Sequence, residues 1–166
     1  MYGQVVQLEQ LAQFHFVDVG DAGQGLAGLD DMDDRPVRVG GCPDEWNLSR
    51  PDAVEELPRA YVDAGSQIVL TNTFRSNRVT LADYALADQA EAINRTGAEI
   101  SCRAVGDRAR VFGSIGPSGR MLMMGEVSED QLLAAFAEQA GALAGGGAHG
   151  LVIETMGDLA EAKLAV

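Results

Sequence analysis

Four short apolar runs, each followed by a helical pattern, constrain the fold of this 166-residue chain more than any other feature. The runs cover residues 14–19, 67–74, 110–115 and 150–155. They are nearly continuous in apolar residues rather than alternating, which is typical of strands buried on both faces of a parallel sheet. The order β-α-β-α-β-α-β-α therefore predicts an α/β fold of four β/α units with right-handed crossovers.

Helix signals lie between the predicted strands. The first helix begins at Pro51, and Pro58 inside it is expected to kink or shorten it. A second, long helical pattern covers residues 80–100. Residues 128–131 form a capping box that begins the third helix, and a fourth begins near Asp158. The connection over residues 27–50 is long, which is typical of a loop that covers a site.

Composition excludes several classes of partner. The chain has 12 Lys and Arg against 25 Asp and Glu, so its formal net charge is −13. Such a chain repels phosphate backbones, which argues against nucleic acid as a partner. It has no apolar run of about 20 residues to span a membrane, and its start does not resemble a signal peptide. A cytoplasmic location is therefore expected.

Polar and small residues follow each predicted strand, where ligands bind in parallel α/β folds. Asp21 and Glu154 can together bind an ammonium group, and the free amides of Ala22 and Gly23 can hold a carboxylate. That pairing is typical of an amino-acid site. The alternative is structural: Asp21 caps a turn, and Glu154 caps the helix that follows it.

Several separate motifs resemble the homocysteine S-methyltransferase family, in the same order along the chain. That family includes the homocysteine-binding domain of cobalamin-dependent methionine synthase and the betaine- and S-methylmethionine-dependent enzymes. The resemblance extends from about Val17 to the last residue. The motifs lie at residues 46–54, 60–65, 71–74, 77–78, 81–84, 91–94, 113–117 and 153–156.

The resemblance implies a (β/α)8 TIM barrel, of which this chain supplies the first four units. A complete barrel needs about 250 residues. Residues 1–13 are then an N-terminal extension, and residues 14–166 are the N-terminal half of a homocysteine-binding barrel domain. The chain is accordingly expected to be truncated.

The resemblance also implies an activity, which is transfer of a methyl group to the zinc-activated thiolate of homocysteine to form methionine. The methyl donor stays open between methylcobalamin, betaine and S-methylmethionine. Asp21 and Glu154 match the acidic contacts to the homocysteine amine, and Ala22 and Gly23 match the amides that face its carboxylate. The segment that lines the pocket is matched by Asn72, Thr73 and Phe74.

Zinc is the largest departure from the family pattern. The family's three cysteine ligands lie in the second half of the barrel, and Cys42 and Cys102 match none of them. His15 and His149 fall at the amino ends of strands, away from the expected site. We therefore predict neither catalytic nor metal-binding residues in this chain, and no activity for the chain alone.

Three interpretations stay open at this point. The chain is half of a methyltransferase that binds homocysteine or a related amino acid, or one half of a barrel assembled from two chains. Alternatively, it is a non-catalytic amino-acid-binding or interaction module. The exposed sheet edges of a half barrel favour self-association or pairing with a missing C-terminal half.

Overall fold

The computed structural model describes residues 41–166. Within them, three parallel strands form one sheet in the order β1-β2-β3. The strands are β1 (Ile68–Leu70), β2 (Arg110–Ile115) and β3 (Gly150–Ile153). They confirm the last three predicted strands and their parallel direction. The predicted extension (1–13), the predicted first strand (14–19) and the predicted site residues 21–23 lie outside the described residues.

Helices alternate with these strands. The α-helices are α2 (Trp46–Ser49), α3 (Pro51–Asp63), α4 (Arg78–Leu81), α5 (Ala90–Val105), α6 (Glu129–Gly145) and α7 (Leu159–Leu164). Short 3-10 turns are η2 (Pro43–Glu45), η3 (Ala82–Tyr84), η4 (Ala87–Gln89), η5 (Gly106–Arg108) and η6 (Leu122–Met124). The end of the predicted 27–50 connection is thus helical. Among the described helices, none has both the length and the apolar character needed to cross a membrane.

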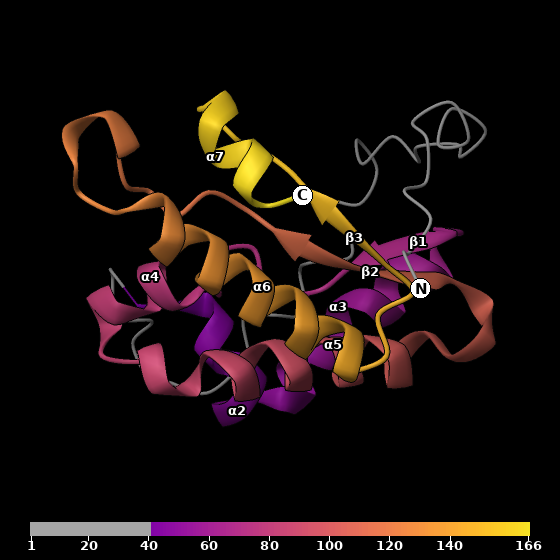
Figure 1. Ribbon diagram of the computed structural model, residues 1–166. Helices are drawn as coiled ribbons and strands as arrows, with labels where there is room; N and C mark the ends of the chain where they lie inside the picture. Colours follow the sequence, from indigo (N-terminus) through magenta and orange to yellow (C-terminus); the bar gives the residue numbers. More distant parts are fainter. Residues whose placement is uncertain (1–40) are drawn as a thin grey trace.

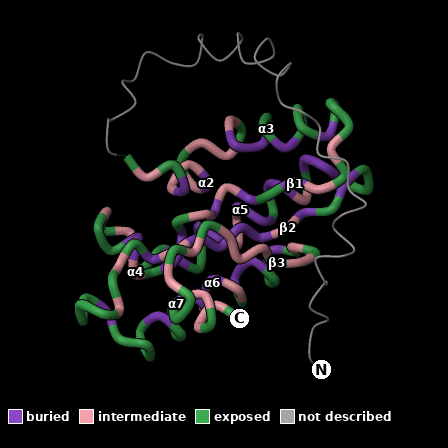
Figure 2. The backbone as a smooth tube through the Cα atoms, turned by 90° about the horizontal axis from the view of Figure 1, so that it is seen from above, coloured by how far each residue is buried: buried purple, intermediate pink, exposed green. Residues whose placement is uncertain are grey.

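Helices α3, α5 and α6 pack on one face of the sheet, below the strands in Figure 1. Two apolar clusters fill this layer. Val69 and Val111 pack with residues of α3 and α5, and Ile115 packs with residues of α6. As a consequence of this packing, most of the chain in β2 and α5 is buried (Figure 2). Helix α5 contacts α2, α3 and α6 and is the centre of the helical layer.

The opposite face of the sheet carries the alternate residues of each strand. Because side chains alternate along a strand, Leu70, Phe112 and Ser114 lie on the face away from the helices. Leu70 is 45% exposed there. The Phe112 ring lies beside Gly150, where a Cβ atom would approach it to 3.4 Å. This face lies next to the strand ends where the family site is expected.

Two helix predictions need correction. Helix α3 continues through Pro58 to Asp63, so the proline does not shorten it. The predicted long helix over residues 80–100 is instead divided into α4, η3, η4 and α5. The first of these, α4, begins before residue 80, because the Asn77 side chain caps it by accepting a hydrogen bond from the Thr80 amide at 2.9 Å. Ala85 then takes a left-handed conformation (φ 59°), which no α-helix can continue through.

The other two helix starts are confirmed. Ser128 and Gln131 make both hydrogen bonds of a capping box, at 3.2 and 2.9 Å. Asp158 caps α7 by accepting a hydrogen bond from the Ala160 amide at 2.8 Å.

Candidate functional site

The carboxyl ends of the three described strands meet at one edge of the sheet. The Gly116 amide, after β2, donates to the Phe74 carbonyl at 2.9 Å. The Glu154 amide, after β3, donates to the Ile115 carbonyl at 3.0 Å. The predicted residues Asn72, Thr73, Phe74 and Glu154 therefore share this edge.

Glu154 is half-buried and has one side-chain partner in the described part of the chain. The Ser114 hydroxyl donates to its Oε1 at 2.6 Å. Its Oε2 has no hydrogen-bond or ion-pair partner among residues 41–166. The alternative role for Glu154 is wrong, because Asp158, and not Glu154, caps the helix that follows.

Thr155, directly after Glu154, has a left-handed backbone with φ 59°. This conformation is rare for a β-branched side chain and costs about 1–3 kcal/mol. Thr155 is also exposed, so its side chain does not compensate by packing. Such strain tends to lie at ligand-binding sites, and here it lies next to the acidic side chain that the sequence singles out.

Two threonine hydroxyls lock the end of β2 to the loop after β1. The Ser114 amide donates to Thr71 Oγ1 at 3.0 Å, and Thr73 Oγ1 donates to the Ser114 carbonyl at 2.9 Å. The two threonine oxygens are 2.5 Å apart. Since Thr73 gives its proton to Ser114, Thr71 must donate to Thr73, and the three groups form a closed cycle. The backbone of Ser114 is thus held from both sides.

Three buried amide side chains on the helices hold the backbone of the loop after β1. Each donates to a backbone carbonyl that has no partner in a strand: Asn47 to Asn72 at 2.8 Å, Gln139 to Thr73 at 2.8 Å and Asn94 to Ser76 at 2.7 Å. Buried carbonyls need such partners. The three amides come from α2, α6 and α5, so three separate elements fix one loop.

The side chains of the predicted pocket segment point in different directions. Thr73 is fully buried and its hydroxyl is used by Ser114, so its role here is structural support. Asn72 Nδ2 donates to the Pro43 carbonyl at 2.9 Å and to Asn47 at 3.1 Å. The half-buried Phe74 ring lies against Gly116, where a Cβ atom would come within 2.7 Å of three ring carbons. Only a glycine allows this approach.

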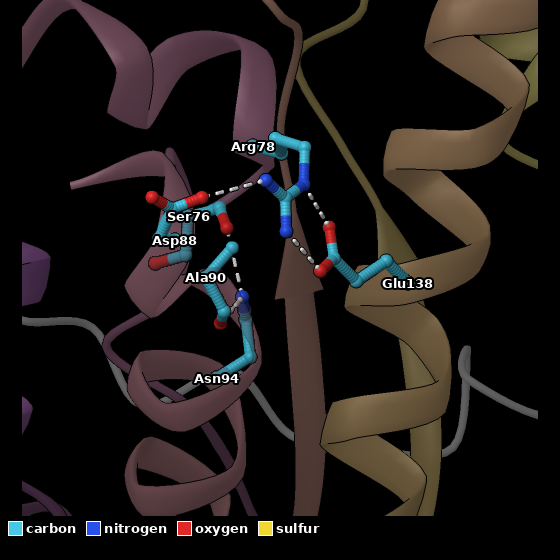
Figure 3. Close-up of polar contacts among 6 residues, drawn as sticks. All are labelled: Ser76, Arg78, Asp88, Ala90, Asn94 and Glu138. Atoms are coloured by element: carbon cyan, nitrogen blue, oxygen red, sulfur yellow. Dashed lines mark hydrogen bonds and ion pairs between the residues drawn. The ribbon is translucent and has the colours of Figure 1, made fainter. Parts of the chain in front are cut away.

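An ion pair joins α4, the helix that follows the loop after β1, to α6 in the helical layer (Figure 3). Arg78 on α4 contacts Glu138 on α6 through two hydrogen bonds of 2.9 and 2.8 Å. It also contacts Asp88 at 3.4 Å. The paired Glu138 carboxylate raises the pKa of Arg78 above its ordinary value. Figure 3 also shows Asn94 reaching the Ser76 carbonyl, so the loop is held on this side too.

The cysteine and histidine side chains of residues 41–166 are not arranged as a metal site. No group of three or more potential ligand side chains comes together within this range. Burial raises the pKa of the Cys42 and Cys102 thiols, and Asp44 adds to the effect at Cys42, which disfavours the thiolate that zinc binds. His149 accepts a hydrogen bond from the Val111 amide at 3.1 Å, so this ring nitrogen serves the sheet.

Two features of this site were not predicted from the sequence. The contact of Ser114 with Glu154 joins two strands, so no local motif reveals it. The alternation of side chains along β2 gives one indication, because Ile115 faces the helices and its neighbour Ser114 must therefore face the other way. The left-handed conformation of Thr155 has no sequence signal, because glycine or asparagine is the residue usually found in that region.

Comparisons with known proteins identify the family of the chain. The model of the family described as homocysteine S-methyltransferase matches residues 17–166. Methionine synthase of Mycobacterium leprae (strain TN) is 33% identical, over 96% of this chain and 14% of that protein. Methionine synthase of Mycobacterium tuberculosis (strain ATCC 25618 / H37Rv) is 34% identical with the same coverage. The chain thus spans about one seventh of the length of these relatives.

Solved structures share the fold. The metallated form of the homocysteine methyltransferase MmuM from Escherichia coli has a TM-score of 0.64 and 21% identity, over 82% of this chain and 59% of that one. Its oxidised form has a TM-score of 0.60 and 22% identity, over 70% and 46%. Because the family match covers nearly the whole chain, the chain belongs to the homocysteine S-methyltransferase family.

Proposed function

We propose that this chain forms the part of a homocysteine S-methyltransferase site that holds the amino-acid end of homocysteine. The observation that carries the proposal is Glu154. It is a half-buried carboxylate at the strand ends, held by Ser114, and it has no cationic partner within residues 41–166. A carboxylate in this position can accept hydrogen bonds from a substrate ammonium group.

The remaining contacts follow from the family resemblance. Asp21 supplies the second acidic contact to the amine, and the amides of Ala22 and Gly23 face the carboxylate. These residues lie outside the described part of the chain, so only Glu154 is supported by geometry. The same resemblance supports a (β/α)8 barrel, to which residues 14–166 contribute the first four β/α units.

The loop after β1 lines the site in this proposal. The Phe74 ring offers apolar surface to the methylene groups of homocysteine, and Asn72 lies beside it. Because Asn47, Gln139 and Asn94 already fix the loop backbone, little conformational entropy is lost when a ligand binds.

Zinc is the group that binds the homocysteine sulfur as a thiolate in the family. The described residues do not fit it, because they contain no suitable ligand cluster and both cysteine thiols have raised pKa values. We therefore assign residues 41–166 the binding of the amino acid and no step through the metal. The methyl donor is not assigned.

Calorimetry with homocysteine under reducing conditions tests this proposal. We expect one molecule bound per chain and about tenfold weaker binding in Glu154→Gln, since a hydrogen bond to a charged group is worth about 1.5–3 kcal/mol. Glu99→Gln makes the same charge change on an exposed position of α5 and should bind like the unsubstituted chain. The absence of binding, or equal binding by Glu154→Gln, would contradict the proposal and favour the interaction module.

Catalysis by the chain alone is tested separately. With homocysteine and each of the three methyl donors, we expect no methionine to form. Methyl transfer by a chain that contains about one zinc ion would overturn the assignment of the metal site to residues outside 41–166.

A further inference from the structure

We infer that Ser114 is a positioning residue for the substrate ammonium group, because its hydroxyl holds one oxygen of Glu154 and leaves the other as the acceptor. The inference rests on the proposed function, since it assumes that Glu154 binds the amine. It adds a residue on a different strand that does not itself need to contact the substrate.

The contact crosses from β2 to β3 on the face away from the helices. Ser114 pairs with Val152 in the sheet register, and Glu154 lies two residues further along on the same face. The distance of 2.6 Å between Ser114 Oγ and Glu154 Oε1 is typical of a hydroxyl that donates to a carboxylate.

Ser114 is itself held firmly. Its amide and carbonyl are both bonded to the hydroxyls of Thr71 and Thr73, so its backbone cannot shift without breaking that cycle. The residue is only 2% exposed, so water does not compete well for its hydroxyl. The position of the Ser114 oxygen is therefore set before any ligand arrives.

A glutamate side chain without a partner occupies several rotamers, and a ligand would have to select one of them. The Ser114 hydroxyl selects a rotamer in advance, which lowers the entropic cost of binding.

The contact is not required to join parts of the fold. The ladder between β2 and β3 already joins the two strands, and Asp158 already caps α7. Within residues 41–166, Glu154 holds no helix end, loop or cation through its side chain. Holding the carboxylate in place is thus the role left for the Ser114 hydroxyl.

The test compares two ligands that differ only in the amine. Homocysteine carries it, and 4-sulfanylbutanoic acid is the same molecule without it. For Ser114→Ala we expect homocysteine to bind about tenfold more weakly, whereas the affinity for 4-sulfanylbutanoic acid changes less than about twofold. Ser114→Thr keeps the hydroxyl and should restore homocysteine binding.

Ser101→Ala is the matched control. Ser101 is as deeply buried as Ser114, and its hydroxyl also donates one hydrogen bond, to the Gly97 carbonyl within α5. We expect this variant to lose some thermal stability without changing the affinity ratio of the two ligands.

The outcomes are separable. If Ser114→Ala weakens both ligands equally, or neither, the positioning role is refuted while the proposed function stands. If the unsubstituted chain does not bind homocysteine, or binds both ligands equally, the proposed function fails and the inference fails with it. Should Ser114→Ala not fold, Ser114→Cys replaces it, because a thiol is a weak donor of similar size; full homocysteine affinity in that variant would overturn the inference.

Discussion

Replacing Gly116 with alanine should displace the Phe74 ring from its place at the strand ends. A Cβ atom on Gly116 would lie within 2.7 Å of three carbon atoms of that ring. Carbon atoms in contact normally lie about 3.5–4.0 Å apart, so the ring would have to retreat by roughly 1 Å. The Gly116 amide is bonded to the Phe74 carbonyl, so the two backbones cannot easily separate.

Overpacking of this kind costs about 1–3 kcal/mol, which is the expected loss in the free energy of unfolding. Urea denaturation followed by far-ultraviolet circular dichroism measures it, and the slope against urea concentration should stay the same. Gly141→Ala is the control. Gly141 lies inside α6, and a Cβ atom added there would meet no atom within 4 Å, so this variant should gain about 0.5–1 kcal/mol.

Phe74→Ala identifies the cause of the loss. Without the ring, the new methyl group has no atom to clash with. Gly116→Ala should therefore hardly change the free energy of unfolding in the Phe74→Ala background. The reasoning is refuted if Gly116→Ala leaves the stability unchanged, or if it costs the same with and without the ring.

Three further substitutions or reactions test other parts of the structure. Thr155→Gly should raise the free energy of unfolding by about 0.5–1 kcal/mol, because the relief of the left-handed conformation exceeds the added flexibility of the unfolded chain; a loss of stability would show that this strain is absent. Glu55 accepts hydrogen bonds from Arg103, which lower the pKa of its carboxyl group, with Arg59 as a second cationic neighbour. Its contribution is therefore present above the unfolded-state pKa of about 4.3 and is lost as the pH falls through the lower folded-state value. Glu55→Gln should cost about 1 kcal/mol at pH 7, and its urea midpoint should meet that of the unsubstituted chain in acid; a gap that persists in acid would mean that the ion pair is not the cause. Burial raises the pKa of Cys102, so its alkylation by iodoacetamide should reach half its maximal rate at a higher pH in the folded chain than in urea, and equal profiles would contradict this.

The sequence pattern predicts which residues are buried better than it predicts the path of the chain. Residues 67–74 are apolar enough for one long strand, yet β1 ends at Leu70. After that point the hydroxyls of Thr71 and Thr73 bond the backbone of Ser114 instead of continuing the ladder. Side-chain competition of this kind depends on a strand far away in the sequence, so no local pattern contains it.

The division of the predicted long helix has a similar origin. Leu86, Ala90 and Ile93 have helical spacing, and all three pack in the same apolar cluster. The chain reaches this cluster through α4 and two 3-10 turns. Asn77 caps α4 before residue 80, and the left-handed backbone of Ala85 prevents one α-helix from continuing to α5. The periodicity therefore identifies the buried face correctly while the backbone is not one helix.

For the site, the sequence and the family resemblance identify Glu154 and the loop after β1 as candidates. What they do not identify is the support behind them. The amides of Asn47, Asn94 and Gln139 are distant in sequence from the carbonyls they hold, and isolated amides on helices give no signal of such contacts. The site residues themselves follow strands and are found by that position.

The most direct test of the account is an NMR titration of the ¹⁵N-labelled chain with homocysteine. If the strand ends hold the amino acid, the largest changes in amide chemical shift should occur at residues 114–117 and 154–157. The amide shifts of α3, which packs on the opposite face of the sheet, should change little. Shifts that concentrate on the helices, or no shifts at saturating homocysteine, would contradict the claim that Glu154 and its neighbours form the amino-acid site.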